Sequence, residues 1–97
     1  RLVGPSVDGL LDLALAHHLA GDVGAEVSAA EAATRIEPDA RRAWSAYAHA
    51  LARTDRLAEC ANACRHALSL GQDAEVSELL ARVHAAAPRG LSERSAA

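Results

Sequence analysis

The sequence predicts an all-α protein, and three observations support this fold class. Alanine supplies about half of the apolar residues of the 97-residue chain, which has one Trp, one Tyr and no Phe. Alanine and leucine are among the best helix formers, whereas the aromatic and β-branched residues that favour strands are few. Apolar residues recur at helical spacing between short breaks, and this arrangement of helices and breaks occurs twice.

The first unit contains two predicted helices. Apolar residues at helical spacing run from Val7 to Leu19, and Gly21-Asp22 interrupts them because glycine and aspartate favour turns. A second run extends from Val23 to Ile36 and is stopped by Pro38, which cannot continue a helix. The two runs therefore predict an antiparallel helical hairpin.

The second unit repeats this plan, and one more helix follows it. Helices are predicted over 41–53 and 56–70, with Thr54-Asp55 as the break between them. Gly71 is expected to end the second of these helices in the left-handed conformation that glycine adopts readily. Asp73 is expected to cap a closing helix that ends before Pro88.

The two units align over a fixed period. Val7 and Arg41 begin corresponding helices, and their spacing is 34 residues (41 − 7). The first helix of a tetratricopeptide repeat carries the pattern W-x2-L-G-x2-Y. The second unit matches this pattern in part, with Trp44, Tyr47, Ala48 and Leu51. The corresponding places in the first unit are occupied by Leu10, Leu13, Ala14 and His17. With the Gly-Asp turn, the terminal proline and the 34-residue period, the chain resembles the tetratricopeptide repeat family. It departs from the family at Glu26, where a small residue is preferred, and at Cys64, where an aromatic one is.

The resemblance implies a fold and a set of boundaries. It implies antiparallel helical hairpins stacked as about two and a half repeats, with five helices, in a right-handed superhelical stack. The expected segments are an N-terminal extension over 1–6, a first repeat over 7–40, a second over 41–72, a closing helix over 73–87 and a flexible tail over 88–97.

The resemblance also implies where a partner binds. In this family the first helix of each repeat lines a concave groove, and protein or peptide partners usually lie in that groove. The positions expected to line it and to contact a partner are Leu11, Leu15, His18, Leu19, Arg42, Ser45, His49 and Arg53. The function expected from the resemblance is therefore a non-catalytic protein–protein interaction module that binds a peptide or helix.

The predicted helix over 7–19 is apolar on more than one side. Leu10 and Leu13 are expected to face the core, whereas Leu11, Leu15 and Leu19 fall on a second face at four-residue spacing. A bound peptide, a further repeat or a second copy of the chain would cover such a face. The alternative function is therefore a self-association or spacer domain of a larger bacterial enzyme or regulator.

The charged residues of the expected groove have two interpretations. Arg42 and Arg53, with His49 between them, would receive an acidic side chain or a peptide carboxylate. A solvated charged surface is the commoner explanation for such residues.

Composition and charge exclude several function classes. The net charge of −3 gives no basic field for nucleic acid, and no apolar stretch approaches the length of a membrane span. We therefore expect neither nucleic acid nor a membrane as a partner, and a cytoplasmic location. All ten basic residues are arginine, which is typical of a GC-rich bacterial coding sequence.

Catalytic and metal-binding roles have little support in the sequence. Cys60 and Cys64 are expected to be reduced and buried, because a four-residue helical spacing is too wide for an unstrained disulfide. The five histidines are spread over several predicted helices, and the sequence carries neither a glycine-rich phosphate loop nor an H-E-x-x-H motif. The sequence therefore predicts no enzyme activity, no cofactor and no metal site.

Overall fold

The computed structural model describes residues 6–86, and within that range the protein is all-helical. The predicted bounds of the second and third helices match the structure, and those of the first and fourth differ by one residue each. The all-α prediction with five helices is thus confirmed. The helices are α1 (Val7–Ala20), α2 (Val23–Ile36), α3 (Arg41–Arg53), α4 (Leu57–Leu70) and α5 (Ala74–Ala86).

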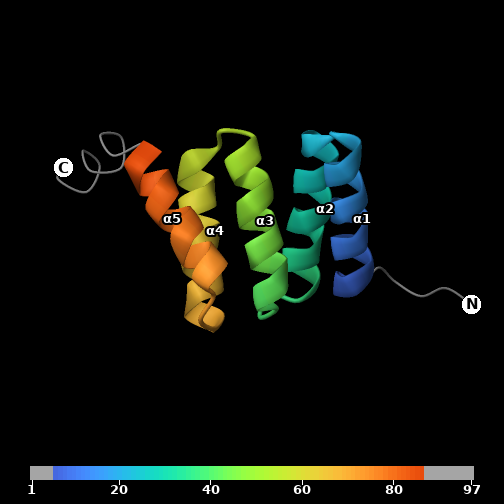
Figure 1. Ribbon diagram of the computed structural model, residues 1–97. Coiled ribbons are helices and arrows are strands. Elements are labelled where there is room, and N and C mark those ends of the chain that lie inside the picture. The colour runs from blue at the N-terminus through green and yellow to red at the C-terminus, as the bar shows by residue number, and fades with distance from the viewer. Residues whose placement is uncertain (1–5, 87–97) are drawn as a thin grey trace, which may run out of the picture.

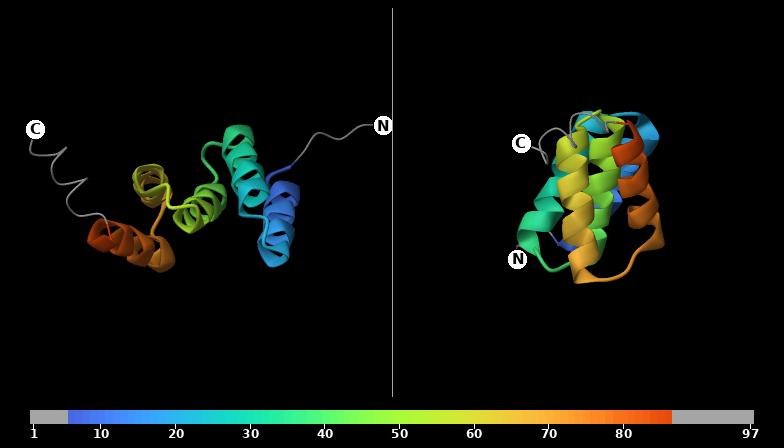
Figure 2. Two further views of the ribbon diagram at one scale, coloured as in Figure 1. Left: turned by 90° about the horizontal axis from the view of Figure 1, so that it is seen from above. Right: turned by 90° about the vertical axis from the view of Figure 1, so that its left-hand side faces the viewer.

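Helical hairpins stack along one direction, with α1 at one end and α5 at the other (Figure 1). Seen from above, α1, α3 and α5 lie on one side of the stack and α2 and α4 on the other (Figure 2). The central helix α3 contacts both α1 and α5 within its own layer. The right-handed superhelix implied by the family resemblance stays a prediction.

The turns explain where the helices end. Gly21 ends α1 with φ of 80°, a left-handed conformation, and its N–H donates to the carbonyl of His18 at 3.1 Å. Asp22 then begins α2, because its Oδ1 accepts a hydrogen bond from the N–H of Ala25 at 3.1 Å. The prediction of a left-handed conformation at Gly71 is wrong, because the φ of 166° and ψ of 163° at this residue are those of extended backbone.

The closing helix is fixed at its start, as predicted. Oδ1 of Asp73 accepts from the N–H groups of Glu75 at 3.1 Å and Val76 at 3.2 Å. Oδ2 of Asp73 accepts from the guanidinium of Arg41 at 2.6 Å. One carboxylate therefore caps α5 and also connects it to the first turn of α3.

The core is built largely from alanine, which lets the helices approach closely. The largest cluster lies between α3, α4 and α5, and its largest fully buried side chains are Leu51, Val76, Cys60 and Cys64. Two smaller clusters join α1 and α2 to α3, one around Val7, Ala33 and Ala43, the other around Ala14, Ala29 and Ala30. The layers are thus held by many small contacts.

The two cysteines are free and buried, as predicted. The Sγ of Cys60 donates to the carbonyl of Ala48 at 3.2 Å. Burial raises the pKa of Cys60. The pKa of Cys64 is raised to about 12, mainly by burial and further by the negative charge of a Cys60 thiolate and a hydrogen bond with Cys60. Both thiols are therefore protonated at neutral pH.

We predict that neither thiol of the folded protein is alkylated at pH 8. The reactive species is the thiolate, and a thiol with a pKa of about 12 is ionised to roughly one part in 10⁴ at that pH. Mass spectrometry after iodoacetamide treatment should find no label on the native chain and two labels after denaturation. The exposed variant Leu19→Cys should be labelled once under native conditions, and any label on the native wild type would contradict the prediction.

None of the five described helices is long and apolar enough to span a membrane. The predicted tail over 88–97 and most of the predicted extension over 1–6 lie outside the described residues.

Candidate functional site

Helix α3 borders two hollows of the surface on its opposite faces. Ala46, His49 and Arg53 follow one another at three- and four-residue spacing and line the first hollow, between α1 and α3. Trp44 and Tyr47 lie on the other face of the helix and line the second hollow, between α2 and α4. We call these the α1–α3 hollow and the Trp44 pocket.

The α1–α3 hollow brings together five of the eight residues expected to bind a partner. It has a volume of about 170 Å³. The side chains that α1 contributes are mostly apolar, and those from α2 and α3 are mostly polar. The residues that line it are Leu11, Ala14, Leu15, His18, Glu26, Ala46, His49 and Arg53.

A buried carboxylate lies beside this hollow. Glu26 on α2 has a side chain only 5% exposed, and it forms an ion pair with Arg53, whose side chain is 37% exposed. The guanidinium of Arg53 donates to both carboxylate oxygens, through Nε at 3.2 Å to Oε1 and through a terminal nitrogen to Oε2. Nδ1 of His18 lies 3.5 Å from Oε1 of the same carboxylate. Glu26 therefore joins α1, α2 and α3, and the charge of Arg53 is largely neutralised.

The structure places the other three predicted residues at the edge of the hollow or away from it. Arg42 pairs with Asp8, and both side chains are mostly exposed. Ser45 contributes its backbone carbonyl, which accepts a hydrogen bond from Nδ1 of His49 at 2.8 Å and so fixes the proton of a neutral ring on that nitrogen. Leu19 lies near the C-terminal end of α1 and is 77% exposed.

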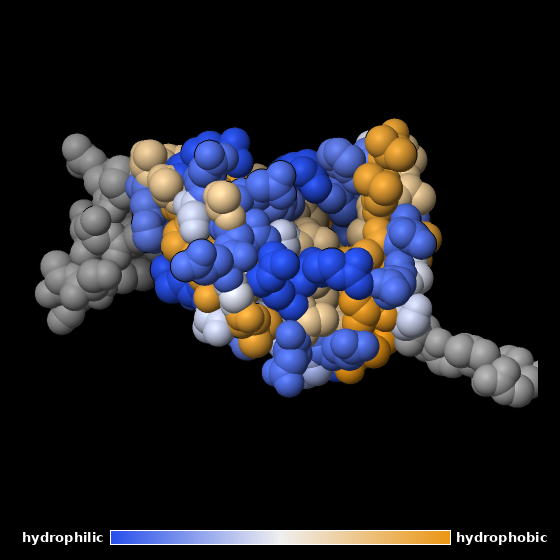
Figure 3. Space-filling view, turned by 60° about the horizontal axis from the view of Figure 1, so that its bottom comes forward, coloured by the Kyte–Doolittle hydropathy of each residue, from blue (hydrophilic) through white to orange (hydrophobic). Residues whose placement is uncertain are grey.

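Apolar surface gathers along α1 at one end of the molecule, beside a mostly polar middle (Figure 3). Leu13, Leu15 and Leu19 are 46%, 55% and 77% exposed, whereas Leu10 packs against a core cluster. The expectation that Leu13 faces the core is therefore wrong. Buried Val7 and Ala14 set the inward face of α1, and at 100° per residue position 13 turns away from that face and from the α1–α3 hollow.

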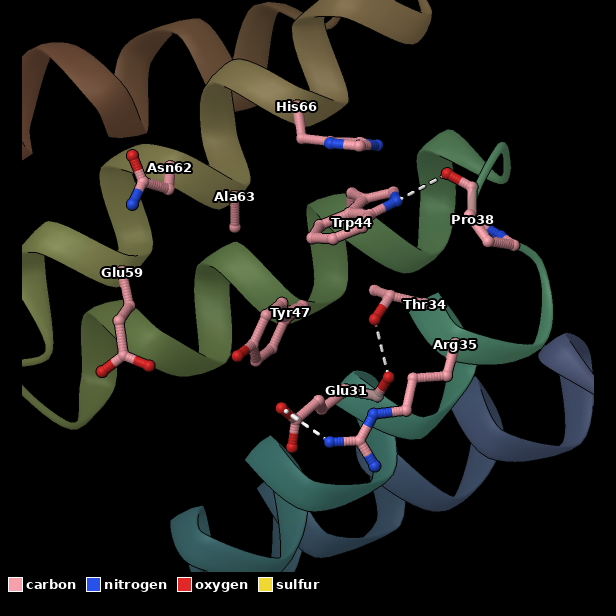
Figure 4. A pocket seen from close by; sticks show the side chains of 10 residues that line it. All are labelled: Glu31, Thr34, Arg35, Pro38, Trp44, Tyr47, Glu59, Asn62, Ala63 and His66. Carbon is pink, nitrogen blue, oxygen red and sulfur yellow. Dashed lines mark hydrogen bonds and ion pairs between the residues drawn. The ribbon is translucent and has the colours of Figure 1, made fainter.

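The Trp44 pocket is larger, with a volume of about 570 Å³. The Trp44 ring stacks on the ring of His66 with centroids 3.9 Å apart, and its Nε1 donates to the carbonyl of Pro38 at 2.8 Å (Figure 4). The ring of Tyr47 is tilted by 58° to that of Trp44, at 6.0 Å between centroids. The residues that complete the lining are Glu31, Thr34, Arg35, Glu59, Asn62 and Ala63.

Sequence reasoning missed the role of Glu26 and the second hollow. In the sequence, Glu26 stands out only as a departure from the repeat pattern. It is nevertheless the one acidic residue on the face that contains Val23, Val27 and Ala30, and such a position signals a paired buried carboxylate. The Trp44 pocket had no comparable signal, because Glu31 and Glu59 come from different helices that only the fold brings together.

Comparisons of the chain with protein-family models, with curated proteins and with solved structures found no match. The tetratricopeptide resemblance therefore stays a prediction that rests on the residues. Between residues 6 and 86, no group of three or more histidine, cysteine, aspartate or glutamate side chains is arranged to hold a metal ion.

Proposed function

We propose that this chain is a non-catalytic protein–protein interaction module that binds an amphipathic helix or peptide of a partner protein along α1 and α3. The observation that carries the proposal is the position of Leu15, a 55%-exposed leucine at the edge of the α1–α3 hollow. Leu11, Ala14 and Ala46 extend the apolar surface beneath it. Exposed apolar side chains beside a hollow are typical of surfaces that receive a partner's side chain.

The size of the hollow favours a side chain over a free small molecule. Sites for small ligands usually enclose roughly 300–1,000 Å³, and the α1–α3 hollow has about 170 Å³. That volume suits one apolar side chain of a partner, with the rest of the partner lying on the surface of α1.

The ion pairs change the expected chemistry of the partner. Arg53 is paired with buried Glu26, and Arg42 is paired with Asp8, so an acidic partner would have to compete with carboxylates already present. The favoured partner therefore presents an apolar anchor, flanked by groups that hydrogen-bond to His18 or His49.

The same proposal includes a cytoplasmic location. Two buried free thiols are in keeping with a reducing compartment, where structural disulfides are rare.

The test is to select helical peptides from a display library against the immobilised chain and to map one of them by methyl NMR. The signals of Leu11, Leu15 and Ala46 should shift on addition of the peptide. The signals of Leu57 and Ala63, on the other side of α3, should stay in place. Shifts centred on Ala63 instead would overturn the assignment of the groove.

A second candidate function is self-association, or a spacer role within a larger protein, through the outer face of α1. The observation that favours it is Leu13, which is 46% exposed on a side of α1 that does not line the hollow. Light scattering separates the two functions. A dimer that dissociates in Leu13→Glu and persists in Leu15→Glu supports self-association, whereas a monomer at all concentrations leaves the peptide-binding proposal in place.

A further inference from the structure

The Trp44 pocket lies on the face of α3 opposite the proposed groove, so its chemistry is separate from the proposed function. Its walls come from three helices: α2 supplies Glu31, α3 supplies the two aromatic rings, and α4 supplies Glu59 (Figure 4). The volume of about 570 Å³ is within the range of sites that enclose small ligands, so the pocket has room for the whole of a long side chain with its charged end group.

The aromatic rings give this pocket its apolar floor. His66 covers one face of the Trp44 ring by stacking on it at 3.9 Å. Tyr47, tilted against Trp44, lies between the two carboxylate-bearing helices. Aromatic faces attract cations through their quadrupole, most strongly when the cation lies within about 6 Å of the ring centroid.

Two carboxylates of the pocket act on Tyr47 more strongly than their arginine partners do. Burial has the largest effect on Tyr47 and raises its pKa above the usual value, and the negative charges of Glu31 and Glu59 raise this pKa further. The positive charges of Arg56 and Arg35 lower the pKa of Tyr47, but each has a smaller effect on it than either carboxylate. The phenol of Tyr47 therefore experiences two carboxylates that their arginine neighbours compensate only in part.

Each carboxylate holds a local arginine that an incoming group can displace or join. Arg35 pairs with Glu31 one turn away at 3.2 Å, through Oε2, and its own side chain is 74% exposed. Arg56 pairs with Glu59 three residues away at 2.7 Å, and both side chains are about half exposed. Exposed pairs at this spacing add little stability, and a carboxylate has room for several donors.

We propose that the Trp44 pocket binds the guanidinium group of an arginine side chain presented by a partner protein. A guanidinium is planar, stacks on aromatic rings and carries five donors, so it can contact Tyr47 while it pairs with Glu31 and Glu59 on the two walls. An ammonium group is more strongly hydrated and lacks a planar face, so lysine fits this site less well. The partner of this pocket is an arginine-bearing peptide, distinct from the apolar helix of the groove.

Fluorescence of Trp44, the only tryptophan in the chain, reports binding directly. The probes are three blocked tripeptides, glycyl-arginyl-glycine and its lysine and citrulline counterparts. Citrulline matches arginine in shape and lacks the charge. The arginine peptide should bind about tenfold more tightly than the citrulline peptide and more tightly than the lysine peptide. Equal affinity for arginine and citrulline overturns the proposal, and equal affinity for arginine and lysine overturns the assignment to a guanidinium.

Matched variants locate the site. The double variant Glu31→Gln/Glu59→Gln should reduce the preference for arginine over citrulline to about twofold or less, because the negative charges on both walls of the pocket are lost. Glu78→Gln, an exposed glutamate on α5, should leave the preference unchanged. Arg35→Ala should strengthen arginine binding about twofold by releasing Glu31.

Circular dichroism checks that each variant keeps its helices, and glutamine at these helical positions keeps a good helix former. An undiminished preference in the double variant overturns the proposal, as does weaker binding in Arg35→Ala. Leu15→Glu, which disrupts the proposed groove, should bind the arginine peptide with unchanged affinity. The proposal for the Trp44 pocket can therefore be tested independently of the proposal for the groove.

Discussion

Leu51→Ala is expected to lower the free energy of unfolding by about 3 kcal/mol. Leu51 is fully buried near the C-terminal end of α3, in the cluster that joins α3, α4 and α5. Its neighbours in that cluster include Cys60, Cys64 and Val76, which are themselves fully buried and cannot move in to fill the space left by the leucine. A domain of this size is stabilised by roughly 5–15 kcal/mol in total, so this one change removes a large part.

Urea unfolding followed by circular dichroism and by Trp44 fluorescence measures this loss. The matched control is Leu19→Ala, the same change at a side chain that is 77% exposed, which should alter stability by less than about 0.5 kcal/mol. Similar midpoints for the two variants would mean that Leu51 is not buried between α3, α4 and α5.

Arg53→Ala is expected to lower the free energy of unfolding by about 2 kcal/mol. The change leaves the carboxylate of Glu26 buried without its guanidinium partner, and an uncompensated buried charge is strongly unfavourable. The expected loss is smaller than the roughly 3–5 kcal/mol of a fully buried pair, because Arg53 is 37% exposed and His18 stays near the same oxygen.

A second substitution tests the cause of that loss. Glu26→Gln removes the buried charge but keeps the shape, so the variant with both substitutions should be more stable than Arg53→Ala alone. Arg42→Ala is the control, because its pair with Asp8 is mostly exposed and should contribute less than about 0.5 kcal/mol. If adding Glu26→Gln lowers stability further, the buried charge is not what Arg53 compensates.

The helices were predictable because their ends are set by local chemistry. Gly21 and Pro38 interrupt the chain through their own backbone preferences, and Asp73 caps the last helix through its own side chain. These signals act over three or four residues, so the linear sequence contains them. Gly71 was misjudged because the chain there leaves α4 in extended form, in close contact with Arg41 on α3, which no local pattern encodes.

The candidate site was predictable in outline only. The family resemblance placed Leu11, Leu15 and His49 in one expected groove, and the constant 100° per residue of a helix fixes which face each of them shares with its neighbours. It did not reveal that Arg53 is neutralised by Glu26, since these residues are 27 positions apart and meet only when α2 packs on α3. Leu13 was misplaced for a related reason. Its exposure depends on which side of α1 has a neighbouring helix, and this is a property of the stack.

The most direct test of the proposed groove compares Leu15→Glu with Leu13→Glu in binding one selected helical peptide. Both substitutions put a carboxylate at an exposed leucine of the same helix, two residues apart, and Leu15 alone lines the α1–α3 hollow. We expect Leu15→Glu to weaken binding of the peptide by about thirtyfold or more, and Leu13→Glu to change its affinity by less than about threefold. Equal losses in the two variants, or a larger loss in Leu13→Glu, would contradict binding in this groove.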